Sequence, residues 1–126
     1  MPDEKKKPTE NYEVIEIGGK EYNLYTGFAF IRELDKRYPT ASDFYGIGLY
    51  TIMAGMDMRN TLSMLDYIQA ATITEKQKPS LADIEITIGK WVEDDVIEDV
   101  FTSFMKRLET SGVTSPIVKK AMKFDK

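Results

Sequence analysis

Apolar and polar residues alternate one by one in YEVIEIGGKEYNLY, residues 12 to 25. The alternation is interrupted only at Gly18-Gly19, and two consecutive glycines supply the positive φ values of a two-residue turn. The pattern therefore predicts a β-hairpin in which Ile17 faces Lys20. The side chains expected on its apolar face are Ile15, Ile17, Tyr22 and Leu24. Because so small a hairpin is unstable alone, this face needs a helix to cover it.

The spacing of apolar residues changes to three or four in GFAFIRELDKRYP, residues 27 to 39, which predicts an amphipathic helix. Thr26 is the expected N-cap and Pro39 the expected stop. The expected buried stripe, which would anchor the hairpin, is Phe28, Ile31, Leu34 or Asp35, and Tyr38. Phe30 lies outside this stripe, so it either widens the buried face or contacts a partner.

The rest of the chain keeps the helical spacing, interrupted by glycine, proline and polar turns. Further helices are expected at about 44–54, closed by Gly55; at about 58–73, capped by Asp57; from Ser80 through Trp91, ended or bent at Gly89; from Val92 to Ser111; and from Ser115 in a short basic segment. The helix at 58–73 has the expected stripe Leu62, Leu65, Ile68, and Ala71 or Thr72. Interior glycines at 46 and 48 indicate either close backbone packing or a weak, adaptable helix.

These elements predict an α+β fold that is mostly α, with an N-terminal β-hairpin followed by five or six helices. The 126 residues suffice for one compact domain, and 42% apolar with 30% charged residues is typical of a globular chain. We expect a disordered polar tail at 1–11 and a single domain at 12–126, made of the hairpin (12–25) and a helical part (26–124).

Composition excludes several classes of chemistry. The chain has no cysteine, so it forms no disulfide and has no thiolate nucleophile, and it has no histidine, the commonest general base and metal ligand. The glycine-containing stretches match neither the P-loop nor the dinucleotide fingerprint. The net charge of −4 argues against a nucleic-acid surface, and no apolar run is long enough to span a membrane. We therefore predict a protein that is not an enzyme.

The densest cluster that suggests a functional site is EDDVIED, residues 93 to 99. Its acids lie within about one and a half helical turns and could together hold a hard cation. Acids near a helix start also complement the helix dipole. The missing calcium-loop spacing and the nearby Lys90 favour the second interpretation, so we expect no metal and no cofactor.

Four methionines lie close together in the sequence, at positions 53, 56, 58 and 64. Methionine fills irregular gaps in cores, and it also suits surfaces that accommodate variable partners. Both interpretations remain open. The candidate partner-binding residues are Phe30, Met53, Met56, Met58 and Met64.

The order of these segments resembles the tail assembly chaperones of long-tailed phages (siphoviruses) and prophages of Gram-positive bacteria. The family's F-x-F-I-R-E-L-D-like helix is matched by Phe28, Phe30, Ile31, Arg32, Glu33, Leu34 and Asp35. A later A-A-T segment, a polar loop and P-S-x-x-D-I are matched by Ala70, Ala71, Thr72, Pro79, Ser80, Asp83 and Ile84. The resemblance covers about residues 12 to 110 and leaves the lysine-rich N-terminal extension unexplained.

The resemblance implies a chaperone that binds the tape measure protein, keeps it soluble and helps to recruit tail tube subunits. Such a protein acts in the cytoplasm of the infected bacterium and is absent from the finished virion. Weak contacts repeated along one long partner favour many copies, so we also expect self-association into rings or helical arrays. The alternatives are a structural tail completion or adaptor protein, and a small regulatory protein-binding domain.

Overall fold

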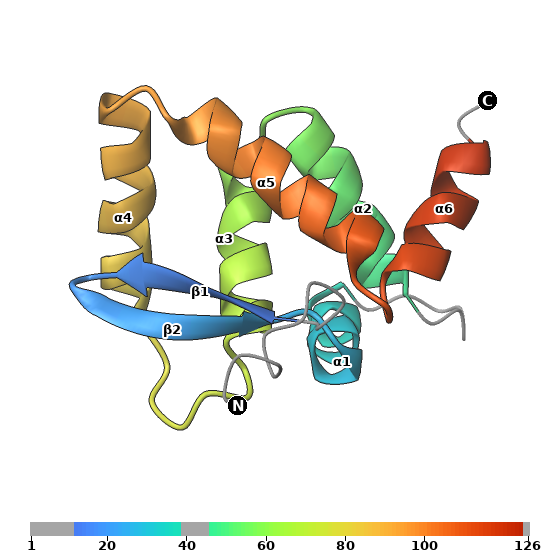
Figure 1. The fold of residues 1–126 in the computed structure, drawn as a ribbon, viewed down its shortest axis with the longest axis horizontal. Coiled ribbons are helices and arrows are strands. Elements are labelled where there is room, and N and C mark those ends of the chain that lie inside the picture. Colours follow the sequence, from blue (N-terminus) through green and yellow to red (C-terminus); the bar gives the residue numbers. More distant parts are fainter. Residues whose placement is uncertain (1–11, 39–45, 125–126) are drawn as a thin grey trace, which may run out of the picture.

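The computed structural model describes residues 12–38 and 46–124. Within these residues an antiparallel hairpin precedes six helices, so the predicted α+β, mostly α class is confirmed (Figure 1). The elements in chain order are β1 (Tyr12–Ile17), β2 (Lys20–Tyr25), α1 (Phe28–Arg37), α2 (Ile47–Asp57), α3 (Thr61–Ala71), α4 (Leu81–Glu93), α5 (Ile97–Thr110) and α6 (Ser115–Phe124). None of these helices is long and apolar enough to cross a membrane.

Three predictions fall on residues outside the described ranges. They are the polar tail at 1–11, the helix stop at Pro39 and a helix start near residue 44. The division into a tail and one domain therefore stays a prediction.

The hairpin has the predicted register, with Ile17 opposite Lys20. Gly18 and Gly19 turn with φ of 60° and 82°, a left-handed region that costs other residues about 1–2 kcal/mol. β1 packs on α4 and β2 on α3. The residues of the predicted apolar face all lie in or against the core: Ile15, Ile17, Tyr22 and Leu24. The helices thus supply the cover that the hairpin needs.

Aromatic rings from four helices meet at the centre of the core. The ring of Tyr67 in α3 lies parallel to that of Phe104 in α5, with centroids 4.2 Å apart. Phe30 of α1 meets Tyr67 edge-on at 5.3 Å, and Trp91 of α4 meets Phe104 edge-on at 6.5 Å. The buried Tyr67 hydroxyl has no hydrogen-bond partner among the described residues. Burial and the nearby Glu13 carboxylate raise the pKa of Tyr67 well above its usual value.

Two glycines let α2 approach its neighbours closely. A Cβ at Gly48 would lie 2.4 Å from the Leu34 carbonyl oxygen, and a Cβ at Gly55 would lie 1.8 Å from Ser63 Oγ. Of the two interpretations of the glycines, close packing is therefore correct at Gly48. The prediction that Gly55 closes the helix is wrong, because this glycine faces α3 and α2 continues beyond it. Gly89 likewise does not end α4, which runs on to Glu93.

Helices α2 and α4 end where a residue other than glycine adopts left-handed backbone. These residues are Arg59, with φ of 61°, and Asp95, with φ of 63°. After α2, the Asn60 N–H donates to the Gly55 carbonyl at 2.9 Å, and an equivalent bond closes α4. Both ends are Schellman motifs, in which glycine is the usual residue at the left-handed position. For this reason no glycine marks the left-handed position at either end, and the expected ends at Gly55 and Gly89 fall too early.

Two predicted N-caps change and one is confirmed. Asp57 is the last residue of α2 and does not cap α3, where the Asn60 side chain accepts a hydrogen bond from the Leu62 N–H at 2.9 Å. Ser80 caps α4 as predicted, accepting from the Asp83 N–H at 3.0 Å. A cap that lies within one turn of the N–H that donates to it is a local feature, which is why the sequence predicts Ser80.

At the start of α1 the predicted cap, Thr26, has another role. Gly27 is the N-cap residue and supplies no side-chain bond. The Thr26 side chain is buried, and its Oγ1 donates to Ser111 Oγ at 3.3 Å. Thr26 thus joins the end of the hairpin to the turn between α5 and α6.

Candidate partner-binding surfaces

Four of the five predicted partner-binding residues lie in the core. Phe30, Met56 and Met64 are fully buried and Met53 almost so, whereas Met58 is 78% exposed. Methionine therefore serves both roles that the sequence left open, as core filler in α2 and α3 and as one surface side chain. Partner binding by these residues stays a prediction, and Met58 alone among the five is positioned for direct contact.

The expected burial of Phe28 is wrong, because this ring is 67% exposed. Buried positions of α1 are Phe30, Ile31 and Leu34. Residues two apart on a helix point about 200° apart, so burying Phe30 turns Phe28 outward. Phe30 is buried in place of Phe28 because its ring packs edge-on against the buried ring of Tyr67.

The turn between α2 and α3 forms a corner with two exposed apolar side chains, Met58 and Leu62, which we call the α2–α3 corner. Leu62 is 63% exposed, so its predicted place in the buried stripe of α3 is wrong. Arg59 holds the corner in place. Its Nε lies 2.8 Å from Glu98 Oε2, and its guanidinium carbon lies 5.5 Å from the centroid of the Phe101 ring. Two apolar side chains are thus presented on a fixed backbone.

A groove of about 720 Å³ runs between α1, the N-terminus of α2 and α6. Figure 1 shows α6 standing at one end of the molecule, beside the start of α2. The exposed ring of Phe28 forms one wall and Ile117 of α6 forms the other. The described residues that line it are Phe28, Ile31, Arg32, Asp35, Lys36, Gly46 and Ile117. We call it the α1–α6 groove.

The free charge of the α1–α6 groove is positive. Asp35 is the one acid among the described residues that line it, and both of its oxygens accept backbone hydrogen bonds at the start of α2, from the N–H groups of Gly46 and Gly48 at 2.9 Å each. A carboxylate held by helix N-terminal N–H groups is balanced by the helix dipole. Arg32 and Lys36 lie at the rim, and Lys36 has only a distant pair at 3.6 Å with Glu33 of its own helix.

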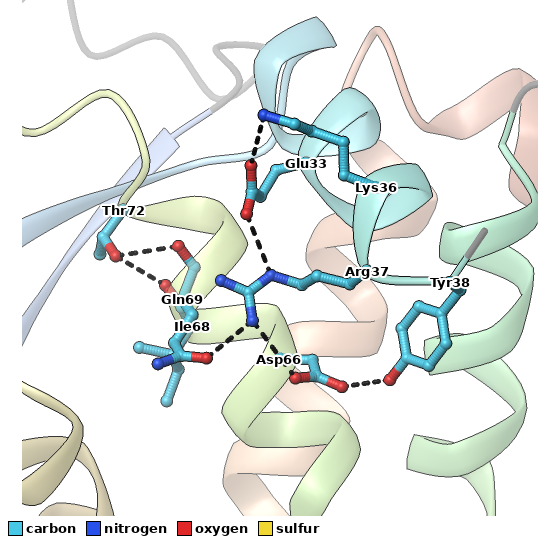
Figure 2. Close-up of polar contacts among 8 residues, drawn as sticks. All are labelled: Glu33, Lys36, Arg37, Tyr38, Asp66, Ile68, Gln69 and Thr72. Carbon is cyan, nitrogen blue, oxygen red and sulfur yellow. Dashed lines mark hydrogen bonds and ion pairs between the residues drawn. The ribbon is translucent and has the colours of Figure 1, made fainter.

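A polar network joins α1 to α3 (Figure 2). Arg37 Nε donates to Glu33 Oε2 at 3.2 Å, and Arg37 Nη1 donates to Gln69 Oε1 at 2.8 Å. The Tyr38 hydroxyl donates to Asp66, whose other oxygen lies 3.7 Å from Arg37. Burial, followed by the bond to the Asp66 carboxylate, raises the pKa of Tyr38 to about 12. Every charged member faces a partner, so the network fixes two helices together and leaves no free acid or base.

The acidic cluster lies at the turn between α4 and α5, residues 92 to 99, which we call the α4–α5 corner. Glu98 pairs with Arg59, and Glu98 and Asp99 occupy the first turn of α5, where acids complement the helix dipole. Two apolar side chains are exposed beside the acids, Val92 at 52% and Val96 at 37%. In the described ranges no group of three or more acids, histidines or cysteines is placed to hold a metal ion.

Comparison with protein-family models gives one match, over residues 14–123, to the model described as "Phage tail assembly chaperone protein, TAC". No curated protein and no solved structure matches the chain. The matched range includes the hairpin from its third residue, all of α1 to α5 and most of α6.

Proposed function

The chain belongs to the phage tail assembly chaperone family, and from this premise we propose that it binds the tape measure protein and keeps it soluble before the tail tube forms. It acts in the cytoplasm of the infected host, helps to recruit tail tube subunits and leaves before the virion is complete. Its phage is a siphovirus or prophage of a Gram-positive bacterium. It works as a non-catalytic assembly factor, and several copies of it bind to one long partner.

One observation carries this proposal at the level of residues, the exposure of Met58 and Leu62 on the α2–α3 corner. A long helical partner presents apolar faces that need cover until its final assembly. Methionine adapts to differently shaped partner surfaces, and a corner with two apolar contacts binds weakly. Weak contacts repeated along a single chain give high avidity and still release one at a time.

The buried candidates support this surface from behind. Met53 and Met56 of α2 and Met64 of α3 belong to the core cluster on which the α2–α3 corner rests. Flexible thioether side chains let the two helices adjust when Met58 meets a partner. Phe30 keeps α1 on the same core through its contact with Tyr67.

The test is co-expression of the tagged chain with the tape measure protein of the same phage. We expect the tape measure to become soluble and to co-purify with several copies of the chain. The Met58→Asp/Leu62→Asp variant should reduce the recovered tape measure about tenfold or more, because a charge replaces each apolar contact. Ile86→Asp is the matched control, since Ile86 is 67% exposed on α4, away from this corner.

Two results would contradict the proposal. An insoluble tape measure with the wild-type chain would remove the binding function, and equal recovery with both variants would remove the α2–α3 corner as its site. Mass spectrometry of purified virions separates a chaperone from a structural tail completion or adaptor protein, because only the structural protein remains in the particle.

A further inference from the structure

The α1–α6 groove and the α4–α5 corner have opposite chemistry. The groove has apolar walls at Phe28 and Ile117, with the exposed cations Arg32 and Lys36 at its rim. Two more exposed lysines, Lys119 and Lys120, follow Ile117 on α6, and neither forms an ion pair with a described residue. This end of the molecule is therefore apolar and basic.

The α4–α5 corner is apolar and acidic. Val92 and Val96 project from it, and both are exposed. The acids around them that form no ion pair with any described residue are Glu93, Asp94, Asp95 and Asp99. Arg59 is occupied by Glu98 and does not offset them. Although the net charge is only −4, positive and negative charges are thus separated between two ends of the folded molecule.

We propose that the α1–α6 groove binds the α4–α5 corner of a second copy of this chain. Val92 and Val96 enter between Phe28 and Ile117, and the acids around the valines face Arg32, Lys36 and the lysines of α6. The occupant follows from the chain's own charges, because the acidic and basic surfaces are complementary and each surrounds exposed apolar side chains. This proposal deepens the chaperone function proposed above, on which its biological purpose rests.

The position of the two surfaces determines the kind of assembly. Figure 1, drawn with the longest axis horizontal, shows the α4–α5 turn and α6 at opposite ends of that axis. A contact between different surfaces at opposite ends is head-to-tail, so each added copy exposes a new groove or a new corner. Such a contact propagates into a ring or an open array. A row of copies along one tape measure has this form.

A small molecule or a nucleic acid fits the groove less well. Small-molecule pockets combine apolar walls with several converging polar groups, and here the acid in the described part of the lining, Asp35, is occupied by the N–H groups of Gly46 and Gly48. A nucleic acid needs a broad basic surface, whereas the chain as a whole carries more acids than bases. A short protein segment with both acidic and apolar side chains complements the apolar walls and the basic rim of the groove.

The experiment is a charge swap followed by sedimentation velocity on the full chain without any tape measure. The groove variant is Arg32→Glu/Lys36→Glu and the corner variant is Glu93→Lys/Asp94→Lys. Wild type should associate as its concentration rises from about 10 to about 300 µM at low salt, and should dissociate at about 500 mM NaCl, because the contact is partly electrostatic. Each variant alone should remain monomeric, since the two reversed charges cancel the two charges of the original sign that stay on the same surface, and the attraction between groove and corner is lost.

Mixing the two variants restores opposite charges at the substituted positions, because the acids introduced into the groove of one face the lysines introduced at the corner of the other. An equimolar mixture should therefore associate, in alternating copies. Lys76→Glu/Lys106→Glu is the control for the groove variant, since it lowers the net charge by the same amount at exposed positions outside both surfaces. It should associate like wild type. Circular dichroism of each variant verifies that it is folded.

Three results would overturn the proposal. They are a wild type that stays monomeric over the whole range at low salt, single variants that still associate, and a mixture that stays monomeric. None of these concerns the tape measure, which is tested with the α2–α3 corner variant. A chain that associates but does not bind the tape measure would overturn the proposed function alone, and a monomeric chain that binds it would overturn this inference alone.

Discussion

Helices α3 and α4 are neighbours of similar length that differ in how much of their surface is buried. In α3 the buried residues form one broad face that covers nearly half of the helix circumference: Ser63, Met64, Tyr67, Ile68, Ala70 and Ala71. In α4 only Ile84 and Ile88 are buried, and Trp91 is partly covered. Figure 1 shows α4 at one end of the molecule with α3 nearer its middle. One helix organises the core and the other covers part of it.

The difference shows where this small protein can expose apolar surface. A helix buried over a broad face loses core contacts with many of its possible large changes, whereas a helix attached by a narrow stripe keeps exposed side chains on its free face. On α4 these exposed side chains are Leu81, Ile86 and Val92. An assembly factor that binds through apolar side chains needs both kinds of helix.

The largest expected effect comes from truncating the centre of α3. Tyr67→Ala removes the ring that stacks on Phe104 and receives Phe30, and should lower the free energy of unfolding by about 3–5 kcal/mol. The matched change on α4, Ile86→Ala, should alter it by less than about 0.5 kcal/mol because Ile86 is exposed. Urea unfolding of both variants measures the contrast, and similar losses would show that α3 is no more central than α4.

A smaller effect on stability distinguishes two tyrosines, Tyr38, which contacts α3, and Tyr67, which lies within it. Tyr38→Phe removes the bond to Asp66 and should destabilise the fold by about 0.5–1.5 kcal/mol. Tyr67→Phe removes a buried hydroxyl without a hydrogen-bond partner in the described structure and should leave stability unchanged or raise it. A clear loss in Tyr67→Phe, measured by the same urea unfolding, would show that this hydroxyl has a bonded partner in solution.

The raised pKa of Tyr38 predicts how the stability of the fold changes at high pH. The folded state keeps the Tyr38 proton up to a pKa of about 12, whereas an unfolded tyrosine loses it near 10. This contribution to stability is therefore complete below about pH 10 and is lost as the pH rises through about 12. Thermal melts of wild type between pH 9 and 12 should show falling stability, and Tyr38→Phe should fall less steeply over that range.

The smallest effect concerns the C-terminal end of α4. Asp95 lies in the left-handed region, with φ of 63°, which glycine adopts without steric cost. Asp95→Gly should therefore stabilise the chain by about 0.5–1 kcal/mol. The melt should be recorded at about 500 mM NaCl, where the proposed contact between copies is screened. Arg59 is the counterpart before α3, but Arg59→Gly also removes the pair with Glu98, so its gain should be smaller or absent.

The sequence predicted those features whose cause lies within a few residues. The glycine pair sets the hairpin register, the alternation sets its buried face, and Ser80 caps α4 through an N–H three residues away. Each depends on local backbone geometry, which the residue types themselves determine. The order of hairpin and helices follows from these signals and from the apolar spacing.

The surface residues were missed because their burial depends on distant parts of the chain. Periodicity indicates that α1 has an apolar face, but it does not indicate whether Phe28 or Phe30 turns inward. Phe30 does so because it packs against Tyr67, which is distant in the sequence. In the same way, only the position of Ser63 explains why Gly55 continues a helix instead of ending it. Of the predicted binding residues, Met58 alone is exposed. Clustering in sequence therefore identified a methionine-rich part of the core more readily than a binding surface.

Trp91 gives the protein a built-in optical reporter. It is the single tryptophan of the chain, it lies on the peripheral helix α4, and its indole approaches the Phe104 ring of the core edge-on. Its fluorescence emission should shift to longer wavelength when α4 leaves α5, since the indole then meets water. Followed together with circular dichroism, this signal would distinguish the release of one helix from the unfolding of the whole domain without any added label.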